Sequence, residues 1–337
     1  MRVNAGAWFR LLRPWSYAAT LVPFLVAASA FGVGPGAGWS RWCAGLVVGL
    51  LFQATVNLLN TWGDERSGVD DVPGAIRTTP QVHEGLVSMR ALFAVAFSCA
   101  ALACAGGILL CFHFAPDAQG VASVRLDIPL LVAGFVGFLG SVNYSTGVKF
   151  KYRGLGVPFV SFLMGPLEIF VAAALLQPEL AHAFTCCAVR SPAAAIAAWT
   201  LWTLPVAALV GVIMHGNDMR DIPSDRAAGI VTLASRLGPR GALAYYRICH
   251  VVPYAACAVF TACAAWRGGW RGALFMLPLL CVPLTAKTLR TANAVYLENP
   301  GCPRWRGLER ASGGIHVAFG ALYAAATALW LLSGRTW

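Results

Sequence analysis

Apolar runs long enough to cross a lipid bilayer recur along the whole chain and restrict its fold more than any other feature. A transmembrane helix needs about 20 predominantly apolar residues, and about nine runs meet this length. Lipid offers the backbone no hydrogen-bond partners, so each run is expected to be a helix. The sequence therefore predicts an all-α polytopic membrane bundle of about nine transmembrane helices in a single domain. The runs cover residues 16–33, 42–62, 89–112, 126–144, 155–176, 194–215, 240–265, 272–292 and 312–333, and the domain covers 1–337.

The composition supports a membrane protein. Hydrophobic residues make up 58% of the chain and charged residues 12%, and the mean hydropathy is +0.67. An ordinary soluble domain carries about 25% charged residues. The 11 cysteines lie mostly inside apolar runs, where a thiol behaves as a small hydrophobe, and their spacing does not indicate a metal site. These features argue against a soluble domain and against a zinc protein.

The charged residues are unevenly divided between the two predicted faces of the membrane. Most of the 25 Lys and Arg residues fall in the N-terminal segment and in the loops after the even-numbered runs. This excess marks the cytoplasmic face or its organellar equivalent. Anchoring to anionic lipid could explain the basic loops by themselves. It does not explain why most of the 14 Asp and Glu residues lie on the same face, concentrated in two of its loops.

The first acidic loop begins at the end of the second apolar run. Asn57, Asn60 and Asp64 are spaced i, i+3 and i+7, so they share one face of a continuing helix. Asp70 follows after a break at Gly68. The pattern predicts a polar stripe that leaves the membrane on the basic side.

The second acidic loop follows the sixth apolar run and repeats this arrangement. Asn217, Asp221 and Asp225 are spaced i, i+4 and i+8, again on one helical face. Carboxylates and amides without histidine or cysteine are hard oxygen ligands, which suit Mg²⁺. An Asp-rich helix end is often only a cap or a solvated face. Two such clusters facing each other favour a site that holds a diphosphate through metal ions.

These two clusters resemble the Asn-x-x-x-Asp and Asp-x-x-x-Asp motifs of the UbiA superfamily of intramembrane prenyltransferases. The resemblance extends over almost the entire chain, at residues 12–17, 60–70, 151–156, 165–167 and 217–233. Within the superfamily the chain is most similar to the naphthoquinone branch: Thr61 stands where bacterial and ubiquinone-pathway members usually carry Asp, and the Gly68-Val69-Asp70 spacing favours the same branch. The resemblance implies an enzyme that transfers a polyprenyl group from an allylic diphosphate, geranylgeranyl or longer, onto a naphthoquinone-type acceptor. That is a step of menaquinone (vitamin K2) biosynthesis, and it depends on Mg²⁺.

The resemblance also assigns roles to residues. The catalytic set would be Asn60, Asp64, Asp70, Asp221 and Asp225, and the Mg²⁺ ligands would be the same five with Asn217. The candidate cations for phosphate oxygens are Arg77, Lys149, Lys151 and Arg220, for which topological charge is the alternative explanation. The candidate acceptor contacts are Arg13, Ser16, Asn143 and Tyr144; interfacial anchoring explains Arg13 and Tyr144 nearly as well.

Two positions depart from the family pattern. Val157 stands where relatives often have an acid, and Glu168 places an acid where they are usually apolar. Glu168 is either a packing residue bonded to a neighbour or a substrate contact. Other aromatic acceptors stay open, among them 4-hydroxybenzoate of the ubiquinone pathway, homogentisate, haem and chlorophyllide.

A transporter or a regulator without catalysis is the alternative of another class. A transporter is expected to show inverted repeats, whereas the two acidic motifs face the same side. The net charge of +11 is attributed to membrane topology, so no nucleic-acid partner is expected. The expected location is a lipid bilayer: the endoplasmic reticulum, Golgi or mitochondrial inner membrane in a eukaryote, or the plasma membrane in a bacterium.

Overall fold

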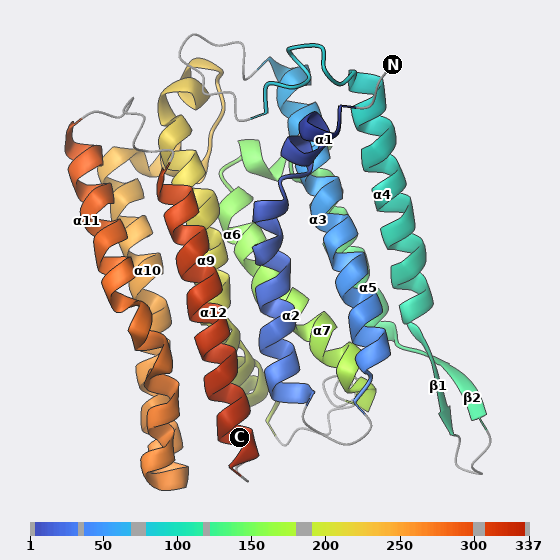
Figure 1. The fold of residues 1–337 in the computed structure, drawn as a ribbon, viewed down its shortest axis with the longest axis vertical. Helices are drawn as coiled ribbons and strands as arrows, with labels where there is room; N and C mark the ends of the chain where they lie inside the picture. Colours follow the sequence, from blue (N-terminus) through green and yellow to red (C-terminus); the bar gives the residue numbers. More distant parts are fainter. Residues whose placement is uncertain are drawn as a thin grey trace.

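The computed structural model describes residues 4–32, 37–68, 79–116, 122–179, 191–298 and 307–333. Long helices run side by side through the molecule, and a two-stranded hairpin projects from one end of the bundle (Figure 1). The elements are α1 (Ala5–Leu12), η1 (Pro14–Tyr17), α2 (Ala18–Phe31), α3 (Trp39–Ser67), α4 (Met89–Leu110), β1 (Phe112–Pro116), β2 (Ala122–Leu126), α5 (Ile128–Asn143), η3 (Phe150–Tyr152), α6 (Gly156–Phe162), η4 (Leu163–Leu167), α7 (Glu168–Leu176), α9 (Pro192–Ala227), α10 (Leu233–Gly268), η5 (Gly269–Cys281), α11 (Val282–Glu298) and α12 (Leu308–Leu332).

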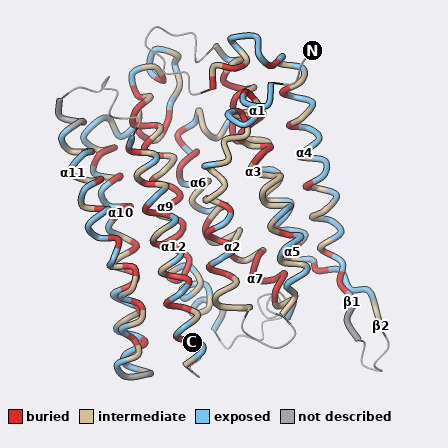
Figure 2. The backbone as a smooth tube through the Cα atoms, in the orientation of Figure 1, coloured by how far each residue is buried: buried red, intermediate tan, exposed pale blue. Residues whose placement is uncertain are grey.

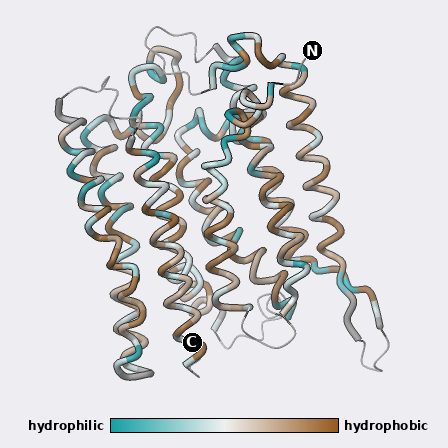
Figure 3. The backbone as a smooth tube through the Cα atoms, viewed as in Figure 1, coloured by the Kyte–Doolittle hydropathy of each residue, from teal (hydrophilic) through white to brown (hydrophobic). Residues whose placement is uncertain are grey.

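The helices confirm the predicted multi-pass membrane fold. Within the described residues, 8 segments are long and apolar enough to cross a membrane, and the fourth predicted run forms the shorter helix α5. Large apolar side chains remain exposed on the outer faces, for example Phe97 at 66%, Leu109 at 71% and Leu280 at 70%. Such side chains are satisfied by lipid. Figures 2 and 3 show exposed and apolar stretches coinciding along the middle of the outer helices.

A short helix that was not predicted precedes the first predicted membrane run, 16–33, and a break in the backbone separates the two. Helix α1 already begins at Ala5, and α2 follows only after the short 3₁₀ turn η1. Arg13 adopts a left-handed conformation (φ 51°) at the break, and Pro14, which has no N–H to donate, starts the next turn. The break directs the backbone oxygen of Leu12 to the Asn57 amide, 2.8 Å away.

The hairpin of β1 and β2 was not predicted. The two antiparallel strands pair Phe112 with Leu126 and continue to Pro116 opposite Ala122. The predicted runs 89–112 and 126–144 include only the outer ends of the two strands, Phe112 and Leu126, and leave the rest between them. Two short strands give a weak sequence signal, because their pairing depends on residues that lie apart along the chain.

Helices α3 and α9 carry the two acidic stripes, and both run without interruption from the membrane into the polar loops. Helix α3 ends only at Ser67, where Gly68 takes a left-handed conformation (φ 68°) that favours glycine. Helix α9 continues through Pro223 to Ala227. Both stripes emerge at the end of the bundle drawn at the top of Figure 1, which we call the motif end.

The hydrophobic core lies mainly between α2, α7, α9, α10 and α12, and buried aromatic side chains occupy the space between these helices. Tyr246, Phe319, Tyr323 and Trp330 are each at most 1% exposed. Close approach of α9 to the preceding helices depends on glycine. A methyl group added at Gly165 in η4 would lie 2.6 Å from the Cβ atom of Ala207. This contact holds the wall that contains α6, η4 and α7 against α9.

Candidate active site

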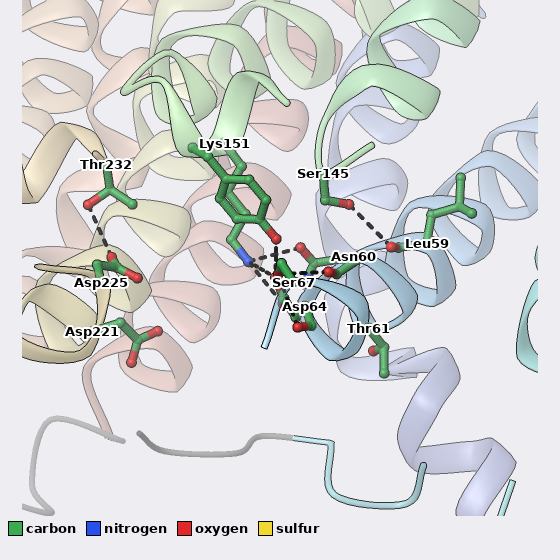
Figure 4. Close-up of polar contacts among 12 residues, drawn as sticks. Leu59, Asn60, Thr61, Asp64, Ser67, Ser145, Lys151, Asp221, Asp225 and Thr232 are labelled. Atoms are coloured by element: carbon green, nitrogen blue, oxygen red, sulfur yellow. Dashed lines mark hydrogen bonds and ion pairs between the residues drawn. The ribbon is translucent and has the colours of Figure 1, made fainter. Parts of the chain in front are cut away.

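A cavity of about 1400 Å³ opens among α2, α3, α5, α7, α9 and α12 and reaches the motif end of the bundle. Both acidic stripes line it, Asn60 and Asp64 from α3 and Asn217, Asp221 and Asp225 from α9. Asp221 and Asp225 lie across the cavity from Asn60 and Asp64 (Figure 4). The structure therefore brings together two clusters that are more than a hundred residues apart in the sequence.

Lys151 is bound to the first cluster. Its Nζ atom donates hydrogen bonds to both carboxylate oxygens of Asp64, at 2.9 and 3.0 Å, and to Oδ1 of Asn60 at 3.1 Å (Figure 4). Burial disfavours the charged ammonium, but the Asp64 carboxylate outweighs this and raises the pKa of Lys151 above its ordinary value. Lys151 therefore carries a positive charge at physiological pH, at the place where a diphosphate would meet Asp64.

Tyr152 adds a second donor to the same carboxylate. Its hydroxyl donates to Oδ1 of Asp64 at 2.5 Å. Burial raises the pKa of Tyr152, and the neighbouring Asp64 raises it further against the opposing effect of Lys151. The hydroxyl therefore keeps its proton and acts as a donor. Both donors come from η3, whose entry is a left-handed Lys149 (φ 57°).

The second cluster is organised by Arg220. Its guanidinium donates two hydrogen bonds to the Asp221 carboxylate, each 2.7 Å long, and a third to Oε2 of Glu309 on α12 at 2.9 Å. The Arg220 side chain is only 5% exposed. Paired hydrogen bonds of this kind fix the orientation of both planar groups. Asp225 accepts a hydrogen bond from the Thr232 hydroxyl at 3.2 Å.

Three polar residues of the two clusters were not predicted: Asp218 and Glu309 line the cavity, and Tyr152 binds Asp64. Asp218 is buried, and its carboxyl interacts electrostatically with Tyr144 and Lys151. Asp218 directly follows Asn217 of the second acidic stripe, so its position in the sequence was a signal that could have identified it. Tyr152 directly follows a predicted phosphate contact. Glu309 gave no signal, because only the packing of α12 on α9 brings it to Arg220.

The predicted acceptor and phosphate residues are divided by the structure. Arg13, Ser16 and Tyr144 line the cavity together with Lys151 and Arg220. Asn143 does not line it: its side chain donates to the Leu139 oxygen and accepts from the Val148 amide.

The remaining predicted residues lie away from the cavity or outside the described chain. Lys149 is exposed, and its ammonium lies 5.8 Å from the ring centre of Tyr152. Asp70 and Arg77 lie outside the described residues. The assignment of site residues stays a prediction.

The donor chemistry of the cavity fits Mg²⁺. Its acidic and amide side chains supply oxygen ligands, and among the described lining residues no histidine stands with them. In the described part of the chain, however, no three His, Cys, Asp or Glu side chains already meet at metal-ligand spacing. Magnesium usually keeps several waters and shares its coordination with substrate phosphates, so few protein ligands per ion suffice.

Comparison with known proteins decides the family. Residues 20–295 match the model of the UbiA prenyltransferase family. The chain belongs to this family. It is 30% identical over 286 residues to UbiA prenyltransferase domain-containing protein 1 of Gallus gallus, and the matched residues make up 84% of this chain and 75% of that relative. The Homo sapiens protein of the same name is 28% identical over 287 residues, 84% of this chain and 74% of the relative.

Solved structures of the UbiA family share this fold. A UbiA homolog from Archaeoglobus fulgidus bound to GPP and Mg²⁺ has a TM-score of 0.57 at 18% identity, covering 96% of this chain and 99% of that one. The same homolog bound to DMAPP and Mg²⁺ has a TM-score of 0.57 at 17% identity and the same coverage. The family model and the relatives, together with the membrane-spanning helices, make this UbiA chain an integral membrane enzyme of a prenyltransferase family and confirm the resemblance found in the sequence.

Proposed function

We propose that this UbiA protein transfers a polyprenyl group from an allylic diphosphate, geranylgeranyl or longer, onto a naphthoquinone-type aromatic acceptor, with Mg²⁺ as cofactor. The observation that carries the proposal is the pair of facing acidic clusters in one largely apolar cavity, with a cation fixed at each cluster. The Archaeoglobus homolog with GPP and Mg²⁺ supports the choice of donor and metal.

The diphosphate would be bound between the two clusters. Mg²⁺ would be held by the carboxylate and amide oxygens of both stripes and would neutralise the charge of the leaving diphosphate. The residues in question are Asn60, Asp64, Asp70, Asn217, Asp221 and Asp225. Lys151 is already charged and directed into the cavity, so it can donate to a phosphate oxygen in place of Asp64.

Arg220 acts differently from Lys151. Three of its N–H groups already bind Asp221 and Glu309. Its main effect would be to hold the Asp221 carboxylate in one orientation before substrate arrives. An orientation fixed in advance lowers the cost of reorganisation during the reaction.

The reaction begins when the C1–O bond of the donor breaks and the diphosphate leaves with the bonding electron pair. The allylic cation that remains is attacked by an electron-rich ring carbon of the acceptor. Loss of a proton or of a carboxyl group from that carbon restores aromaticity. Apolar residues such as Phe52, Phe138 and Val210 line the cavity, and they keep water away from the cation.

The naphthoquinone acceptor is inferred from the motif that contains Thr61. The Thr61 hydroxyl lies 3.4 Å from a guanidinium nitrogen of Arg13 and 3.2 Å from the Thr79 hydroxyl. An Asp at position 61, usual in bacterial and ubiquinone-pathway members, would place a carboxylate beside Arg13 where this chain has a neutral hydroxyl. Arg13 is a predicted acceptor contact, so the neutral Thr61 hydroxyl beside it is the difference that supports the choice of acceptor.

Product analysis tests the proposal directly. Purified protein in detergent, with Mg²⁺ and geranylgeranyl diphosphate, is expected to prenylate 1,4-dihydroxy-2-naphthoate or reduced menadione, as detected by mass spectrometry. Product formed only from 4-hydroxybenzoate would retain the prenyl transfer and reject the naphthoquinone acceptor. Absence of product with all three acceptors, from protein that is folded and supplied with magnesium, would reject the transfer itself.

Removal of the metal is expected to stop the reaction. With EDTA in excess, the rate of prenyl transfer should fall at least ~10²-fold, because Lewis-acid stabilisation of a leaving group contributes several kcal/mol. Added Mg²⁺ should restore the rate, whereas Zn²⁺, which prefers nitrogen and sulfur ligands, should not. An unchanged rate in EDTA would contradict the assignment of both clusters as metal ligands.

A further inference from the structure

A carboxyl group lies deep in the cavity wall, far from both acidic clusters. Glu168, the first residue of α7, lines the cavity, and its Oε2 atom is buried without a hydrogen-bond partner in the described structure. Its other oxygen faces Gly49 of α3. A methyl group added at Gly49 would lie 3.5 Å from Oε1 of Glu168 and 3.1 Å from Cγ2 of Thr20. The Thr20 hydroxyl interacts with the Glu168 carboxyl, so the two residues form a polar pair beside Gly49.

An irregular turn directly precedes Glu168. Residues Leu163–Leu167 form the π-helical turn η4, which contains Pro166. A π turn inserts one residue into the helical repeat and so rotates the helix that follows, and such turns are frequent at functional sites. Leu163, Met164 and Leu167 of this turn line the cavity with Glu168. The turn therefore directs a costly polar side chain inward, where regular packing would favour an apolar one.

The depth of this pair can be read from α3. Gly49 and Asp64 lie on the same helix, so a rise of 1.5 Å per residue separates them by about 22 Å along the helix axis. Polar side chains nearer the motif end bind one another, as Asn57 does with Ser16 at 2.9 Å. Glu168 differs because one of its oxygens has no such partner. An extended geranylgeranyl chain, anchored by its diphosphate at Asp64, reaches about this depth, and longer chains pass it.

We propose that Glu168 and Thr20 form a polar stop in the cavity that sets the length of the donor's hydrocarbon tail. The proposal rests on the proposed function, because it assumes that the diphosphate is bound at the acidic clusters. Donors up to geranylgeranyl diphosphate place their tails on the apolar wall before the stop. A longer tail must cover the Glu168 carboxyl with hydrocarbon, which cannot supply the missing hydrogen bond and excludes the water that could.

The test measures binding of unreactive donor analogues, so it does not depend on the acceptor. Thiolodiphosphate analogues of geranyl, farnesyl, geranylgeranyl and solanesyl diphosphate are titrated with Mg²⁺ into the full chain in detergent. For the natural sequence, affinity is expected to rise up to the geranylgeranyl analogue and then to stop rising. In Glu168→Leu, the solanesyl analogue should bind about tenfold more tightly, which corresponds to about 1.4 kcal/mol, while the geranyl analogue is unchanged.

Matched variants separate a polar stop from a packing role. Glu168→Gln keeps a polar group and should retain the original chain-length profile. Thr20→Val should shift the profile in the same direction as Glu168→Leu, by a smaller factor. Thr55→Val is the control: this threonine is also fully buried, but its hydroxyl binds the Leu51 oxygen and it does not line the cavity. It should leave the profile unchanged.

Three outcomes have distinct meanings. If the ratio of solanesyl to geranyl affinity is the same in Glu168→Leu as in the natural sequence, or if all analogues weaken equally, the polar stop is rejected. If the analogues bind with the expected profile but no acceptor is prenylated, the stop stands and the transfer reaction is rejected. If no analogue binds the natural protein, both proposals fall together.

Discussion

Replacement of Asp64 by Asn is expected to lower the rate of prenyl transfer by ~10³-fold or more, the size of effect that follows when several kcal/mol of transition-state stabilisation are lost. Asn has the same shape and can still accept from Lys151 and Tyr152, so the local structure should survive. What is lost is the negative charge that would bind Mg²⁺. Product formation under saturating geranylgeranyl diphosphate measures the effect, and Asp221→Asn should reproduce it.

The neighbouring Glu65 provides the control. It follows Asp64 on α3 but does not line the cavity. Glu65→Gln removes one negative charge from the same helix turn and keeps the shape of this half-buried side chain, so it should leave the rate within about twofold. A Glu65→Gln variant as inactive as Asp64→Asn would point to general charge on this helix. A fully active Asp64→Asn variant would remove Asp64 from the proposed metal site.

Replacement of Arg220 by Met is expected to have the largest effect on stability. The substitution leaves the Asp221 and Glu309 carboxylates facing each other without their shared cation. Breaking a buried ion pair by removing one partner costs about 3 to 5 kcal/mol, and we expect the lower end of this range. The reason is that the Asp221 and Glu309 side chains keep 29% and 25% of their exposure. Unfolding in detergent, followed by circular dichroism, measures the loss.

Arg247 is a matched control for Arg220. It is also a guanidinium on a long helix, but it binds the neutral side chain of Asn293, at 2.6 and 2.9 Å, near the surface. Arg247→Met should change the free energy of unfolding by less than about 0.5 kcal/mol. Adding Glu309→Gln to Arg220→Met should recover part of the lost stability, because a neutral amide needs no cation. Equal stability of the two Arg variants would show that Arg220 is not a structural clamp.

Membrane residence and the two acidic stripes could be predicted because both are local properties of the sequence. Length and apolarity are sufficient to identify a spanning helix, and the spacing of Asn60 and Asp64 places them on one helical face. The break at Arg13 and the hairpin beyond α4 were not predicted. Both depend on which distant residues form hydrogen bonds with the freed backbone groups, as the Asn57 side chain does when it donates to the Leu12 oxygen.

By itself the sequence determined that this protein is a helical membrane protein, that its acids gather at two helix ends, and that these ends lie on one side. Only the tertiary structure decided which side chains meet. Lys151 reaches Asp64, and Glu309 reaches Arg220, because helices distant in sequence pack together. Helical periodicity specifies which face of a helix a side chain occupies. It contains no information about the partner helix, and that choice brings Glu168 to the cavity wall opposite Gly49.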